Sequence, residues 1–138
     1  MLAAIRLLII HVFAALAIWL CTYIAGLDII LSLVYLVVIS MEISSIKNES
    51  LLTKGVTALL WLGIPTLLSI ITSFRLSNIG IFILEFWFTP ILPILSLKPY
   101  VFESGRPLYY YALIWLPVLM AVHFFLLTRR RDGGFTIK

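Results

Sequence analysis

The sequence is poor in charged residues for a chain of its length. Of its 138 residues, 12% are Asp, Glu, Lys or Arg and 63% are hydrophobic, and the mean hydropathy is +1.17. Soluble globular domains carry about 25% charged and about 45–50% apolar residues, and a domain this small leaves a large fraction of its surface in water. The composition therefore excludes a soluble globular domain and indicates a protein that is embedded in a lipid bilayer.

The residue patterns of soluble enzymes are missing as well. The single cysteine, Cys21, lies inside an apolar run and cannot form a disulfide within the chain. The sequence contains no Cys/His pattern for zinc, no glycine-rich phosphate loop and no nucleophile elbow. We therefore predict no catalytic residues and no cofactor, and we expect membrane lipids to be the main small molecules that the chain contacts.

Long apolar runs are what the sequence has in quantity. Runs of about 18 or more residues with few charges are typical of membrane-spanning helices. We predict an all-α, polytopic helical bundle that forms one transmembrane domain over residues 1–138. Its spans are predicted at about 7–25, 29–45, 56–74 and 108–127, a polar loop at 44–55 and a basic tail at 128–138.

The run at 79–97 differs from the others. It carries Glu85 in its middle, and Pro90 and Pro93 lie three residues apart in its second half. Proline removes a backbone donor and interrupts a helix. We therefore predict a proline-broken re-entrant or interfacial helix beside four complete spans. The alternative is a bundle of five spans, in which this run crosses the membrane.

The distribution of basic residues favours four spans with both ends of the chain in the cytoplasm, because Lys and Arg gather in cytoplasmic loops. With five spans, the ten basic residues divide equally between the two sides. With four spans, only Arg75, Lys98 and Arg106 lie outside, and the remaining seven lie on the side of the C-terminus. We expect the cluster Arg129, Arg130 and Arg131 to fix this topology by holding the C-terminus in the cytoplasm. A bacterial cytoplasmic membrane is the expected location, and nucleic acid is not an expected partner.

Two histidines lie inside predicted spans, where ionisable groups are costly and functional by default. His11 and His123 lie one to two turns from the cytoplasmic ends of their spans in the four-span arrangement, in one layer with Glu42. Two histidines at one depth could ligate haem iron or a metal ion, although two residues without a spacing motif are a weak signal for such a site. The more ordinary interpretation is that each histidine hydrogen-bonds to a neighbouring helix, while Glu42 pairs with Lys47 or Lys54.

Glu85 is the most distinctive single residue, because it lies among aromatic and aliphatic neighbours. A carboxylate in apolar surroundings is expensive unless it finds a partner. Arg75, Lys98 and Arg106 are the candidate ion-pair partners. The functional interpretation is a substrate or ion site in the re-entrant element, and the structural one is an interfacial carboxylate paired with a nearby arginine.

Small and hydroxyl-bearing residues recur at helical spacing on two runs. Thr66, Ser69 and Ser73 form a polar stripe together with Gly63. This stripe predicts either one wall of a water-filled pathway or a hydrogen-bonded seam between helices, of which the seam is commoner. A helix-packing face is predicted at Ala17, Cys21 and Ala25, since small residues let helix backbones approach.

These features predict a small non-catalytic accessory, assembly or regulatory subunit that packs against a larger membrane partner. The alternative is a homo-oligomeric transporter or channel that uses Glu85, since four helices alone provide few walls for a pathway. The sequence offers least support for a membrane redox or lipid-modifying enzyme that uses His11 with His123 or Glu85 with Arg106.

Overall fold

The elements of the protein are all helices in the computed structural model, which describes residues 2–24, 26–74, 78–97 and 108–129. The prediction of an all-α fold is confirmed, and no strand occurs in these ranges. The helices are α1 (Leu2–Cys21), α2 (Leu27–Ser45), the 3-10 turn η1 (Ile46–Asn48), α3 (Leu51–Phe74), α4 (Asn78–Phe88), α5 (Leu92–Leu95) and α6 (Leu108–Thr128).

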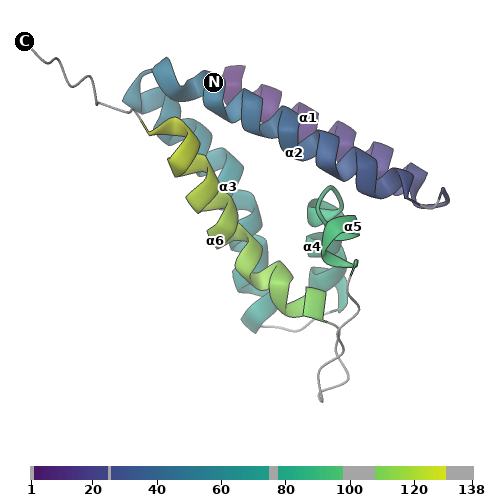
Figure 1. Ribbon diagram of the computed structural model, residues 1–138. Helices are drawn as coiled ribbons and strands as arrows, with labels where there is room; N and C mark the ends of the chain where they lie inside the picture. Colours follow the sequence, from purple (N-terminus) through teal and green to yellow (C-terminus); the bar gives the residue numbers. More distant parts are fainter. Residues whose placement is uncertain (1, 25, 75–77, 98–107, 130–138) are drawn as a thin grey trace, which may run out of the picture.

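The long helices form two pairs that together make a V (Figure 1). α1 packs along α2, and α3 packs along α6. The pairs meet where α1 begins and α6 ends, and they diverge toward the opposite end, with α4 and α5 in the opening. The start of α3 lies beside the end of α6, where Lys54 Nζ donates a 3.5 Å hydrogen bond to the carbonyl oxygen of Thr128. α3 and α6 are therefore antiparallel.

Three helical segments are long and apolar enough to cross a membrane: Ala3–Cys21, Leu27–Asn48 and Leu51–Thr72. A shorter apolar segment, Trp115–Thr128, belongs to α6. Large apolar side chains remain exposed along these helices, among them Phe13 at 74%, Leu59 at 73% and Leu126 at 65%. Contact of such surfaces with lipid is not penalised, whereas their exposure to water is unfavourable. The structure thus fits a membrane-embedded protein.

Two helices extend beyond the starts of the predicted membrane spans. α1 starts at Leu2 rather than residue 7 and includes Arg6, and α3 starts at Leu51 rather than residue 56. Ser50 fixes the second boundary, because its Oγ accepts the backbone N–H of Thr53 at 3.2 Å and so caps α3. The predicted polar loop at 44–55 is correspondingly shorter, and Lys54 lies inside a helix.

Two glycines have structural roles that a side chain would oppose. Gly26 joins α1 to α2 with φ of 86°, a left-handed conformation that glycine adopts without steric cost. Gly80 lets α4 approach α3 closely, because a Cβ at this position would lie 3.2 Å from Thr72 Oγ1. α4 is therefore held tightly against α3.

All four basic residues in the described ranges lie toward the end of the molecule where the two pairs meet. Arg6 of α1 forms an ion pair with Glu42 of α2, with 2.7 Å between Nε and Oε1. This contact replaces the predicted pairing of Glu42 with Lys47 or Lys54, because α1 extends far enough to bring Arg6 beside α2. Lys47, Lys54 and Arg129 complete the set.

Candidate functional site

The most unusual feature of the fold is a helix that ends inside the bundle. α4 stops at Phe88, and the chain turns back through Thr89, Pro90 and Ile91 into α5. Pro90 has no N–H to donate to the carbonyl of Phe86, four residues earlier, so the α-helical pattern cannot continue. The sequence expectation that prolines interrupt this run agrees with the end of α4.

A helix that ends away from water must satisfy its last four carbonyl groups within the protein. The backbone N–H of Thr89 donates to the Phe86 carbonyl at 3.3 Å, and that of Ile91 donates to the Phe88 carbonyl at 2.8 Å. The Thr89 hydroxyl donates to the Glu85 carbonyl at 3.1 Å. The remaining carbonyl, that of Trp87, accepts from a side chain of another helix.

That side chain is His11 of α1, whose Nε2 lies 2.8 Å from the carbonyl oxygen of Trp87. Because a carbonyl oxygen only accepts hydrogen bonds, Nε2 must carry the proton. His11 Nδ1 lies 2.8 Å from the hydroxyl oxygen of Tyr35 on α2. A neutral imidazole protonated at Nε2 fits both contacts, with Tyr35 donating its proton to Nδ1. His11 therefore joins α1, α2 and the end of α4.

Aromatic rings enclose His11, which is 2% exposed. The ring centroids of Tyr35, Trp61 and Trp87 lie 5.7, 5.2 and 4.6 Å from that of the imidazole. His11, Tyr35 and Trp61 are all close to the middle of their helices. α4 thus reaches the mid-length of the long helices before the chain turns back, and we call these four side chains with the Trp87 carbonyl the His11 cap.

Glu85 lies two residues before Trp87 on α4 and lines an open groove. The groove has a volume of about 550 Å³ and lies between the second half of α1 and the α4–α5 segment. Its lining is mostly apolar and aromatic: Leu16, Trp19, Phe82, Phe86 and Leu92, with Glu85 and Thr89 as the polar residues. Glu85 already takes part in an interaction within the protein. We call this space the Glu85 groove.

The histidines do not share one layer, contrary to the sequence expectation. His123 Nε2 lies 3.1 Å from Ser40 Oγ, whereas His11 contacts Tyr35. Ser40 and Tyr35 are five residues apart on α2, a rise of about 7.5 Å. The expectation failed because α1 begins at Leu2, which places His11 near the middle of the helix. Both ring nitrogens of His11 are engaged, so it offers no lone pair to a metal.

The predicted polar stripe on α3 divides between two environments. Thr66 is exposed, and its hydroxyl donates to the Leu62 carbonyl of its own helix at 2.6 Å. Ser69 is buried at 5% exposure and has a partner within the protein. The two residues therefore do not line a common surface. The side chain of Ser73 and the residues Arg75, Lys98, Arg106, Arg130 and Arg131 lie outside what the structure describes.

The predicted packing residues also separate. Ala17 lines a narrow apolar groove of about 400 Å³ between α1 and α2, which fits a packing role. Cys21 is half-buried at the end of α1, and Ala25 is not described. A Cβ at Gly63 would meet no described atom within 4 Å, so Gly63 does not mark a close contact between helices. The close approach of α4 to α3 is at Gly80 instead.

Sequence reasoning missed Tyr35, Trp61 and Trp87 as parts of the site. A signal for Trp87 existed, because a proline soon after a helical residue leaves nearby carbonyls without their usual donors. A histidine in a span is a suitable donor for such a carbonyl. Nothing in the sequence, however, pairs His11 with a residue 76 positions later.

The described residues contain no group of three or more His, Cys, Asp or Glu side chains arranged to hold a metal ion. Comparison of the chain with protein-family models, with curated proteins and with solved structures gave no match. The function must therefore be argued from the geometry alone.

Proposed function

We propose that this protein is a small non-catalytic membrane subunit that acts by packing against a larger membrane partner. One observation carries the proposal: three ionisable side chains of the long helices, His11, His123 and Glu42, join the chain's own helices. Both His11 nitrogens, His123 Nε2 and the Glu42 carboxylate contact neighbouring helices. Side chains used in this way stabilise the packing of the helices.

The proposed topology has four spans, α1, α2, α3 and α6, with α4 and α5 entering and leaving from one side. α4 has 11 residues and rises about 16 Å, well short of the roughly 30 Å hydrocarbon core. The antiparallel packing of α3 on α6 supports the same topology. The basic residues at the opposite end support a cytoplasmic location for both chain ends. A bacterial cytoplasmic membrane is the proposed location.

The Glu85 groove is the proposed contact surface for the partner. Its aromatic and aliphatic lining would accept an apolar helix, and the Glu85 carboxylate can accept more than one hydrogen bond. A membrane-spanning helix of the partner with a lysine, arginine or hydroxyl side chain at the level of Glu85 has the matching chemistry. Hydrogen bonds of this kind stabilise helix pairs in membranes.

Photo-crosslinking in native membranes tests this proposal. A photoreactive amino acid replaces Phe82 in the groove, or Leu126 on the exposed face of α6 as the control. We expect Phe82 to give one heteromeric adduct of defined mass, which is lost with Glu85→Gln, and Leu126 to give none. Adducts with lipid alone at both positions would overturn the proposal.

A homo-oligomeric cation transporter or channel is the second candidate, favoured by the position of a carboxylate in an open groove beside a broken helix. Against it, the carbonyls at the end of α4 are already satisfied, whereas broken transporter helices use such carbonyls to coordinate ions. An adduct of twice the chain mass at Phe82, together with cation flux in vesicles that Glu85→Gln abolishes, would establish this candidate instead.

A further inference from the structure

A second groove lies at the charged end of the molecule, between α3 and α6. Its volume is about 590 Å³, and it is distinct from the Glu85 groove. Two cations, Lys54 and Arg129, line its end nearest the charged end of the molecule. The other lining residues include Gly55, Ala58, Phe124 and Phe125. We call it the α3–α6 groove.

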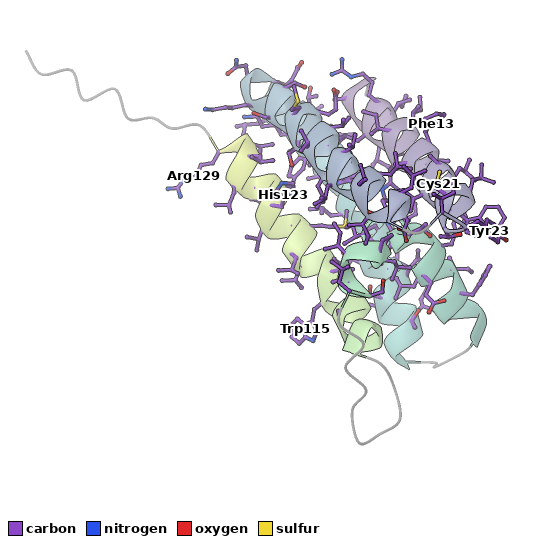
Figure 2. The ribbon with its side chains drawn as sticks, turned by 45° about the vertical axis from the view of Figure 1, so that its right-hand side comes forward. Phe13, Cys21, Tyr23, Trp115, His123 and Arg129 are labelled. Carbon is purple, nitrogen blue, oxygen red and sulfur yellow. The ribbon has the colours of Figure 1, made fainter. Side chains whose placement is uncertain are left out.

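The two cations come from different helices and line the same groove. Lys54 belongs to the first turns of α3, and Arg129 directly follows α6. Lys54 Nζ has a long 3.5 Å contact with the Thr128 carbonyl, which leaves two of its three N–H groups for other acceptors. Figure 2 shows Arg129 extending away from the end of α6. Within the described ranges, the ion pair at this end involves Arg6 and Glu42, and neither groove cation takes part in it.

The remainder of the groove is apolar and runs along the helices away from the charged end. Gly55 carries no side chain, and a Cβ there would meet no described atom within 4 Å, so the space beside it is open. Ala58 lies one turn further along α3, and Phe125 of α6 is 61% exposed. These residues provide a channel for a hydrocarbon chain directly below two positive charges.

We propose that the α3–α6 groove binds an anionic phospholipid. Its phosphate would lie between Lys54 and Arg129, and one acyl chain would lie over Gly55 and Ala58 against Phe125. Basic pockets between membrane helices bind anionic headgroups in this way. The inference is independent of the partner proposed for the Glu85 groove, since the two grooves share no residue.

The test is native mass spectrometry of the full chain in detergent, titrated with phosphatidylglycerol, phosphatidylcholine or inorganic phosphate. We expect phosphatidylglycerol to bind at least several-fold tighter than phosphatidylcholine, and inorganic phosphate neither to bind nor to displace it. Lys54→Gln and Arg129→Gln should each weaken binding about fivefold, as expected for loss of one headgroup charge. Lys47→Gln, at the same end but outside the groove, is the matched control and should change nothing.

Gly55→Leu separates the groove from simple surface charge, because it fills the acyl channel and keeps both cations. We expect it to abolish selective phosphatidylglycerol binding while tryptophan fluorescence shows an intact fold. Equal binding of the two lipids, or an equal loss with Lys47→Gln, would overturn the proposal. Binding of inorganic phosphate as tight as that of phosphatidylglycerol would also overturn it, because a plain anion site needs no acyl channel.

Discussion

At the scale of single residues, His11 explains how a helix can end in apolar surroundings. Its Nε2–H supplies the donor that the Trp87 carbonyl lacks, and Tyr35 holds the imidazole in the required tautomer. Leaving a buried carbonyl unsatisfied costs about 1–3 kcal/mol. The histidine is therefore a structural donor, and its burial among three aromatic rings is a consequence of that role.

Replacement of His11 should destabilise the bundle in a graded way. We expect His11→Ala to lower the free energy of unfolding by about 2–3 kcal/mol, since it removes two hydrogen bonds and leaves a cavity. Tyr35→Phe keeps the bond to Trp87 and should cost about 0.6 kcal/mol, the average for one interhelical hydrogen bond, and at most about 1.7 kcal/mol. Denaturant titration in mixed micelles, followed by tryptophan fluorescence, measures both. An unchanged His11→Ala variant would show that the cap is dispensable.

His123 should be less important than His11. Its partner Ser40 also donates to the Leu36 carbonyl at 2.6 Å, so that hydroxyl keeps a bond when the histidine is removed. We expect His123→Ala to cost less than about 1 kcal/mol in the same titration. A loss as large as that of His11→Ala would indicate that the contact between α2 and α6 depends on this residue.

At the scale of elements, the short α4–α5 segment fills the opening between the two helix pairs (Figure 1). Its position depends on the close approach at Gly80, where an added Cβ would lie only 3.2 Å from Thr72 Oγ1. The Thr72 hydroxyl is itself fixed by a 2.7 Å bond to the Leu68 carbonyl. A larger residue at position 80 must therefore displace the Thr72 side chain or move α4 away from α3.

Gly80→Leu tests this dependence. We expect a loss of about 1–3 kcal/mol in unfolding free energy, as is usual for overpacking, together with a shifted tryptophan emission as Trp87 moves relative to His11. Gly63→Leu is the matched control, because its Cβ meets no described atom within 4 Å and its side chain would face open space. Equal effects of the two substitutions would argue that Gly80 matters only for helix propensity.

The elements differ in how far the sequence determines them. The prolines of the run at 79–97 indicated where a helix ends, because the loss of a donor is a local property. α1 and α3 extend beyond the starts of the predicted spans and include Arg6 and Lys54, because charged residues can occupy the first turns of a helix near an interface. Glu85 stood out in the sequence, but its groove depends on contact with α1, which no local pattern encodes.

At the scale of the whole molecule, two antiparallel helix pairs enclose a capped helix of about half their length. The described basic residues gather toward one end, beside the α3–α6 groove, and the Glu85 groove involves the second half of α1. The two grooves therefore suit different occupants, an anionic headgroup in one and a partner helix in the other. Both assignments require that α4 and α5 enter and leave the membrane on the same side.

Cysteine accessibility in intact cells tests that requirement most directly. Single cysteines replace Asn48, the last residue of η1, and Ser104, between α5 and α6 in the sequence, in a Cys21→Ala background. With four spans, a membrane-impermeant maleimide should label position 104 in intact cells, and position 48 only after permeabilisation. Labelling of both positions in intact cells would mean that the run at 79–97 crosses the membrane, and it would contradict the account.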